Sequence, residues 1–137
     1  MPTPEERKAE IEASGIHAHL GITILEAGPE KVVLELPVGP TVHQPYGLLH
    51  GGVSALLAES AASIGGALNV SDGKGIVGIE ISASHLRSMT SGTLVATATP
   101  IRIGRSIQVW HIDLTDGTGR QIADAKCTVS VIDLPGA

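Results

Sequence analysis

A lone carboxylate and a glycine pair lie on one apolar stretch of this chain, and together they could carry out hydrolytic chemistry. Gly51-Gly52 opens a helical pattern that continues to about Leu68, and Glu59 lies about two turns along it. The first backbone N–H groups of a helix have no partner within the helix and lie at the positive end of its dipole. An oxyanion developing near Gly51 or Gly52 would therefore be stabilised, and a carboxylate such as Glu59 can act as nucleophile or general base.

Each of these residues also has an ordinary structural interpretation. Two glycines before a helix often form only a turn, and a single Glu in an apolar helix often reaches water at the rim of a core. At about 100° per residue, Glu59 falls with Gly52 and Ser63 on a flank of the helix, outside the stripe that we expect to meet the core. That stripe consists of Val53, Leu56, Leu57, Ser60, Ile64, Ala67 and Leu68.

The spacing of the two chemical groups bears on assembly. Glu59 lies about 10–12 Å along the helix from its start, so it reaches a carbonyl bound at Gly51 of its own helix only awkwardly. We therefore expect a second chain to supply one of the two groups.

Length, composition and charge exclude several classes of protein. The 137 residues are 42% hydrophobic and predict one domain, 1–137, with no room for a second and no apolar run as long as a membrane span. A net charge of −5 and only two aromatic residues, Tyr46 and Trp110, argue against nucleic-acid binding. Residues 1–8 lack the apolar core of a signal peptide, so we expect a cytoplasmic protein.

The sequence offers poor ligands for a metal. Cys127 is the only cysteine and lies in an alternating pattern, which predicts a buried packing residue and forbids an internal disulfide. His43 and His50 are seven residues apart across a Pro-Gly turn, which is poor spacing for a ligand pair.

The remaining elements predict an α+β fold. Within a helical segment at 1–18, a short helix runs from Thr3, its cap, to about Ser14 and ends at Gly15. Six strands are expected, at Ile22–Ala27, Lys31–Leu36, Ile76–His85, Gly92–Arg102, Ser106–Thr115 and Gln121–Val131. We expect Pro37 to close the second strand and the last three strands to form an antiparallel meander. An antiparallel sheet curled around the long helix would cover its apolar face, and joining sheet edges predicts a dimer.

The chain resembles a known family, the hotdog-fold acyl-CoA thioesterases of the 4-hydroxybenzoyl-CoA thioesterase type. The resemblance covers nearly the whole chain and is carried by Gln44-Pro45-Tyr46-Gly47-Leu48-Leu49-His50-Gly51-Gly52 with Glu59, by Val77 to Arg87, and by Leu94 to Trp110. The last two segments look most like the 1,4-dihydroxy-2-naphthoyl-CoA hydrolases of menaquinone biosynthesis. The resemblance implies a homodimer that pairs into a homotetramer, and no cofactor beyond the coenzyme A of the substrate.

The resemblance also implies roles for individual residues. Glu59 would be the catalytic carboxylate and the Gly51 N–H would polarise the thioester carbonyl, with Ser63 holding the attacking water or the carboxylate. Gln44 and His50 would orient the thioester. Gly52 would contact the substrate, and His85, Arg87, Arg105 and Ser106 occupy positions suited to contacts with the phosphates of coenzyme A. Arg105 in a Gly-Arg-Ser turn can also be part of an ordinary solvated turn.

Two other functions remain open at this point. A non-catalytic acyl-CoA or small-ligand binding protein of the same fold would have no need of Glu59. A dehydratase of that fold usually places a His or Asp in a different motif, which this sequence lacks. No nucleophile elbow surrounds Ser54 or Ser60, so a Ser-His-Asp arrangement is not recognisable.

Overall fold

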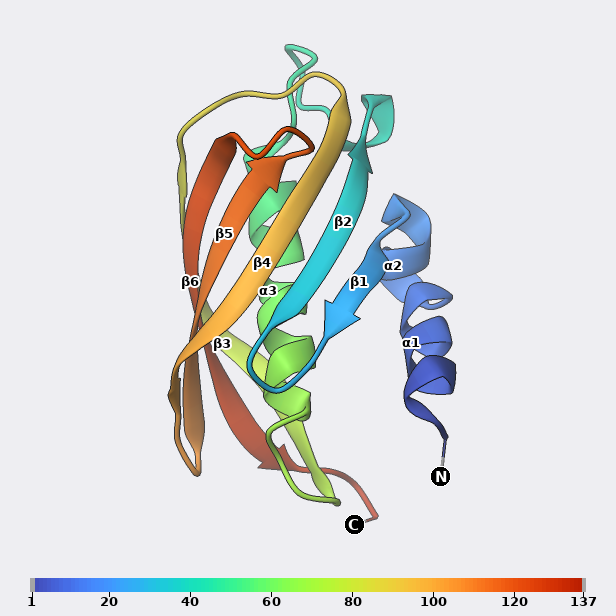
Figure 1. The fold of residues 1–137 in the computed structure, drawn as a ribbon, viewed down its shortest axis with the longest axis vertical. Helices are drawn as coiled ribbons and strands as arrows, with labels where there is room; N and C mark the ends of the chain where they lie inside the picture. Colours follow the sequence, from blue (N-terminus) through green and yellow to red (C-terminus); the bar gives the residue numbers. More distant parts are fainter. Residues whose placement is uncertain (1, 137) are drawn as a thin grey trace.

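An antiparallel sheet of six strands forms the body of the molecule, and one long helix packs against it (Figure 1). The computed structural model describes residues 2–136. Its elements are α1 (Pro4–Glu12), α2 (Gly15–Leu20), β1 (Thr23–Ala27), β2 (Val32–Val38), the 3₁₀ helix η1 (Pro40–Val42), α3 (Gly51–Ala67), β3 (Lys74–His85), β4 (Gly92–Ile103), β5 (Ile107–Asp116) and β6 (Gln121–Asp133). Within the described residues, no helix combines the length and apolar character needed to cross a membrane.

The order of the strands confirms the expected architecture. The sheet runs β1-β2-β4-β5-β6-β3, with all neighbours antiparallel, so β4, β5 and β6 form the predicted meander. α3 packs against β2 through β6. β1 and β3 are left as the two edges of the sheet.

Pro37 lies inside β2, so the expectation that it closes this strand is wrong. It pairs with Thr93 of β4 and lies beyond the last pair between β1 and β2, which joins Thr23 to Glu35. Because β1 does not pair with β2 at Pro37, the N–H group that proline lacks interrupts no hydrogen bonds between these two strands. The strand therefore continues to Val38.

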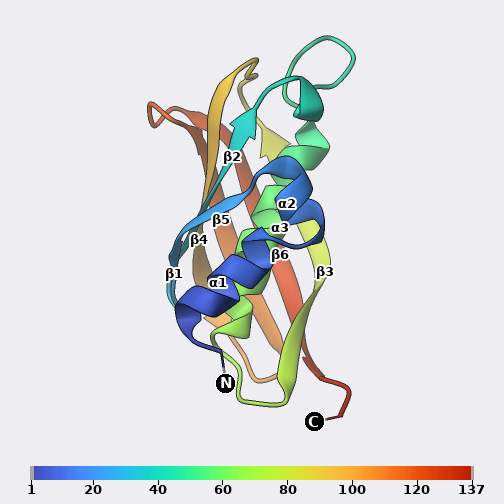
Figure 2. The same ribbon diagram turned by 90° about the vertical axis from the view of Figure 1, so that its right-hand side faces the viewer.

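The two short helices α1 and α2 come before the sheet in the chain. They lie beside α3, at the edge of the sheet that β1 forms (Figure 2). α1 begins with the expected cap, because Thr3 Oγ1 accepts a hydrogen bond from Glu6 N and Glu6 Oε2 accepts one from Thr3 N. The expectation that Gly15 ends this helix is wrong: α1 stops at Glu12, and Gly15, with φ +52°, turns the chain into α2. Glu12 Oε2 accepts a hydrogen bond from Ile24 N at 2.8 Å, which fastens α1 to β1.

The face of α3 that meets the sheet carries mainly small side chains, which corrects the predicted core stripe. Its buried residues are Ser54, Leu57, Ala58, Ala61, Ala62, Gly65 and Gly66. Of the predicted stripe only Leu57 is buried, whereas Val53, Leu56, Ser60 and Ile64 are half-buried and Ala67 and Leu68 are exposed. Small side chains let the helix approach the sheet closely. Val53, Leu56 and Ile64 pack against the margin of the core and stay only partly buried.

Two glycines of α3 fit against buried side chains of β5. The Trp110 ring covers Gly65, where an added Cβ would lie 2.5 Å from the ring carbon Cη2. Trp110 Nε1 donates to Gln108 Oε1 at 3.0 Å, and Gln108 Nε2 donates to the carbonyl oxygen of Gly66 at 3.2 Å. Both side chains are fully buried, and their polar atoms are satisfied by these bonds. The contacts fix the rotation of α3 about its own axis.

Replacing Gly65 by Ala should lower the free energy of unfolding by about 1–3 kcal/mol, because the new methyl group would overlap the Trp110 ring. At an exposed helix position with no neighbouring side chain, the same change raises the free energy of unfolding by roughly 0.5–1 kcal/mol. The sign of the change at Gly65 therefore tests whether the ring packs there. Gly117→Ala is the control, since a Cβ there meets nothing within 4 Å. Urea denaturation followed by circular dichroism measures both variants. A Gly65→Ala protein as stable as the wild type would contradict this packing.

Candidate active site

The loop before α3 is closed by the side chain of Gln44. Gln44 Oε1 accepts hydrogen bonds from Tyr46 N at 2.6 Å and Leu48 N at 3.2 Å, and Gln44 N donates to the Leu48 carbonyl oxygen at 2.7 Å. Gly47, with φ +80°, makes the turn at the tip. The carbonyl end of the Gln44 amide therefore shapes the loop, and the amide nitrogen remains as the donor.

At the start of α3, one of the two candidate oxyanion donors is already engaged. His50 is the N-cap, and its Nδ1 accepts a hydrogen bond from Gly52 N at 2.8 Å. Gly52 permits this contact, because a Cβ there would lie 2.9 Å from that nitrogen. No residue of the described chain accepts a hydrogen bond from Gly51 N. The Gly51 N–H is thus the free donor at the positive end of the helix.

Glu59 lies half-buried on the flank of α3 that faces β3. Its carboxylate occupies the space above Gly78, where any Cβ would overlap it, next to a bulge between Gly78 and Glu80. Burial raises the pKa of the Cys127 thiol to about 11, with smaller contributions from the negative charges of Glu59 and Glu80. Cys127 is buried as expected and remains a neutral thiol, so it is not a nucleophile at neutral pH.

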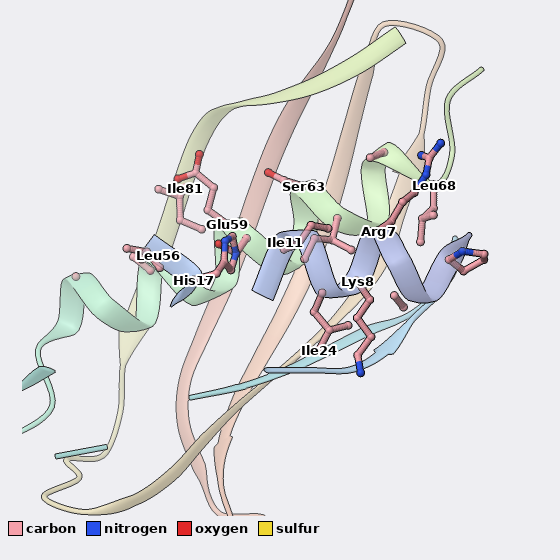
Figure 3. Close-up of a pocket in the computed structure, with 17 residues that line it drawn as sticks. Arg7, Lys8, Ile11, His17, Ile24, Leu56, Glu59, Ser63, Leu68 and Ile81 are labelled. Atoms are coloured by element: carbon pink, nitrogen blue, oxygen red, sulfur yellow. The ribbon is translucent and has the colours of Figure 1, made fainter. Parts of the chain in front are cut away.

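Most of the residues predicted for the site divide between two cavities of the chain, while His50, Arg105 and Ser106 line neither of them. Glu59, Ser63 and Gly52 line a mainly aliphatic cavity of about 780 Å³ between α1, α2 and α3, which we call the α1–α3 pocket (Figure 3). A second cavity of about 380 Å³, the loop pocket, is lined by Gln44, Leu48, Leu49, Gly51, Ser54, His85, Leu86, Arg87, Ser88 and Ile122. Gly51 and Glu59 are separated by eight residues of helix, or about 12 Å along its axis, and they line different cavities of one chain.

The four residues expected to contact coenzyme A phosphates are not brought together within one chain. His85 and Arg87 line the loop pocket, and His85 pairs with Ala123 near the start of β6. Arg105 and Ser106 form the turn between β4 and β5, where the Ser106 carbonyl oxygen accepts a hydrogen bond from Val131 N. Eight residues of β6 separate these positions, or about 25 Å. Arg105 and Ser106 therefore lie at the other end of the sheet.

His85 contacts the start of α3 directly. A Cβ at Gly51 would come within 2.8 Å of His85 Nε2, so the imidazole covers the face of Gly51. His43 and His50 do not form a metal pair, since His43 Nε2 bonds to the Thr90 carbonyl oxygen at 2.8 Å and His50 caps the helix. Across residues 2–136, no group of three or more His, Cys, Asp or Glu could hold a metal ion.

One wall of the α1–α3 pocket was missed by the sequence analysis. Arg7, Lys8 and Ile11 of α1 and His17 of α2 line it opposite α3 (Figure 3). The sequence predicts a helix in this segment, but the spacing of its residues contains no signal for where that helix docks. α1 has no buried residue and no apolar stripe that would have indicated its position.

Comparison with known proteins gives a consistent result. Residues 46–123 match the family model described as the thioesterase superfamily. A 1,4-dihydroxy-2-naphthoyl-CoA hydrolase from Listeria monocytogenes is 45% identical over 117 residues, or 85% of this chain and 95% of that protein. The proofreading thioesterase EntH of Cronobacter sakazakii is 40% identical over 114 residues, or 83% of each protein. The crystal structure of a thioesterase from Haemophilus influenzae superposes with a TM-score of 0.90 at 40% identity, covering 98% of this chain and 94% of that one.

Proposed function

The chain belongs to the thioesterase superfamily and is a thioester hydrolase of the hotdog fold, and from this premise we propose that it hydrolyses acyl-CoA esters of compact aromatic acids. Candidates are 1,4-dihydroxy-2-naphthoyl-CoA and benzoyl-type esters, which would yield the free acid and coenzyme A. The observation that carries the proposal is the Glu59 carboxylate in the wall of an aliphatic cavity of about 780 Å³. A cavity of that size lies within the range of small-molecule sites.

The lining of the α1–α3 pocket supports the proposed preference for aromatic acyl groups. Its apolar side chains include Ile11, Ile24, Leu56, Ile64 and Ile81, so a flat ring would bury its surface against aliphatic groups. The name of the Listeria monocytogenes relative, a 1,4-dihydroxy-2-naphthoyl-CoA hydrolase, supports the same class of acyl group for this chain. A place in menaquinone biosynthesis is part of the proposal.

The reaction follows from the groups available. The Gly51 N–H, at the positive end of α3, would hydrogen-bond the thioester oxygen and stabilise the oxyanion as it forms. Glu59 would either attack the carbonyl carbon, expelling the coenzyme A thiolate and leaving an anhydride that water opens, or take a proton from water as it attacks. Ser63, one turn beyond Glu59, would hold that water or the carboxylate. The Gln44 amide nitrogen and His50 Nε2 would orient the thioester.

We also propose that each active site combines two chains. In one chain Gly51 and Gln44 line the loop pocket while Glu59 lines the α1–α3 pocket, and this division supports a site in which a partner supplies one half. The edge strand β3 pairs only with β6, and its Val77 and Ile79 side chains are 42% and 57% exposed. An unpaired edge of this length favours pairing with a second copy. A dimer of dimers would give the homotetramer.

A phosphate site assembled from more than one subunit would fit the remaining residues. His85 and Arg87 at the loop pocket would contact the coenzyme A phosphates directly, while Arg105 and Ser106 would reach them from another subunit. No cofactor beyond the coenzyme A of the substrate and no metal enters this scheme. Because acyl-CoA esters are intracellular metabolites, we propose a cytoplasmic location.

Replacing Glu59 by Gln tests the function most directly. The turnover rate on benzoyl-CoA should fall by roughly 10²-fold or more with substrate binding largely unchanged, because Gln keeps the shape of the side chain and removes its charge. Stopped-flow detection of released thiol, with KM and the melting temperature of the variant, measures this. Unchanged turnover in a folded variant would end the catalytic assignment of Glu59, whereas a wild type that binds acyl-CoA esters without hydrolysing them would favour an acyl-CoA binding protein.

Replacing Gly78 by Ala tests the position of the carboxylate. The new methyl group would occupy the space that now holds the Glu59 carboxylate, so turnover should fall about tenfold or more while the flexible Glu59 side chain rotates away and the fold persists. Gly39→Ala is the matched control, since a Cβ there meets nothing within 4 Å. Full activity in Gly78→Ala would mean that this carboxylate position is not the catalytic one.

Mixing two inactive proteins tests the shared site. Glu59→Gln lacks the carboxylate and Gly51→Pro lacks the N–H donor, so subunit exchange should restore one intact site per mixed dimer. Gly51→Ala controls for the contact with His85, because it adds a Cβ and keeps the N–H. Activity is measured after exchange has been verified by mass spectrometry. Parents that stay inactive after exchange would show that each chain builds its own site.

A further inference from the structure

The α1–α3 pocket contains a histidine that the proposed reaction does not use. His17 of α2 lines this pocket together with Glu59 and Leu56. Figure 3 shows His17 at the Glu59 end of the pocket, level with Leu56 along α3, whereas Arg7 and Leu68 lie at the other end. The Nε2 atom of His17 is shielded from solvent and has no hydrogen-bond partner among residues 2–136.

An unpartnered nitrogen of this kind is costly to keep. Buried polar side-chain atoms in folded proteins are nearly always hydrogen-bonded, and those that are not call for an explanation. Burial lowers the pKa of His17 below its ordinary value, so its ring is neutral near pH 7. A neutral imidazole nitrogen either donates or accepts a hydrogen bond, according to its tautomer. His17 is therefore equipped to bind an uncharged polar group.

The apolar character of the rest of the pocket makes a hydrogen bond to His17 important for distinguishing one ligand from another. Around His17 the lining is largely aliphatic, with Ile11, Leu56 and Ile81, and its other polar side chains near this end belong to the catalytic flank of α3. An apolar cavity with a few placed polar groups distinguishes ligands by where their polar atoms fall. A ligand that left His17 unpaired would gain less on binding than one that satisfied it.

We propose that His17 is a specificity-determining residue that hydrogen-bonds a hydroxyl or oxo substituent on the acyl group. The inference rests on the proposed function, since it takes the α1–α3 pocket as the acyl site. Through this residue α2 selects oxygen-substituted aromatic acids over unsubstituted acids of nearly the same size.

The test compares substrates that differ by a single hydroxyl. kcat/KM is measured for benzoyl-CoA and for its 2-, 3- and 4-hydroxy derivatives with the wild type, His17→Leu and His17→Gln. The wild type should prefer at least one hydroxylated ester. His17→Leu should lower kcat/KM for that ester about 10- to 100-fold and change benzoyl-CoA less than about threefold. His17→Gln should retain most of the preference, because its amide both donates and accepts.

Stability provides a second readout. Because Leu replaces an unpartnered polar side chain, His17→Leu should melt at the same temperature as the wild type or higher. His19→Leu, on the same helix and exposed, should change neither the preference nor the melting temperature. A lower melting temperature for His17→Leu would show that His17 has a structural partner, and an equal loss on all four esters would show a general role. Either result overturns the proposal.

The outcomes separate this inference from the proposed function. A wild-type protein that hydrolyses neither these four esters nor 1,4-dihydroxy-2-naphthoyl-CoA would remove the proposed function and the role of His17 with it. An active wild type whose preference is absent, or is unaffected by His17→Leu, would remove only the role of His17.

Discussion

A close contact between α3 and β5 sets how the long helix lies against the sheet. Gly65 has no side chain, so the Trp110 ring can lie against the helix backbone, and the Gln108 amide then bonds to the carbonyl oxygen of Gly66. With the small face held to the sheet, Leu56 and Ile64 lie at the margin of the core and are only partly buried. Their remaining surface lines the cavity beside Glu59.

The same constraint explains where sequence-based prediction succeeded and failed for the fold. Alternation of apolar and polar residues was a reliable guide to the strands that α3 covers, because β2, β4, β5 and β6 bury alternate residues. The buried face of α3 was wrong, because a hydrophobic stripe ranks residues by apolar character whereas close packing selects them by size. Pro37 was misjudged because the effect of its missing N–H depends on which strand lies beside it. Gly15 was misjudged because its positive φ turns the chain directly into α2.

For the candidate site, the sequence identified which residues have side chains suited to the chemistry. It did not show which of those residues lie together in the folded chain. The resemblance of Gln44 to Gly52 drew attention to the start of α3, and helix geometry separated Gly51 from Glu59. Only the three-dimensional arrangement shows that Gly52 N is taken by His50, which leaves the Gly51 N–H free. The docking of α1 and α2 depends on contacts such as that of Glu12 with Ile24 N, and no local pattern predicts them.

The ring that covers Gly65 belongs to the single tryptophan of the chain, and the single tyrosine, Tyr46, lies 87% exposed at the tip of the loop before α3. The intrinsic fluorescence of this protein therefore has one emitter in the interior, at the junction of helix and sheet. A shift of its emission to longer wavelength would report that water has reached this junction. The optical signal of unfolding is thus a local measurement of the contact that orients α3 against the sheet.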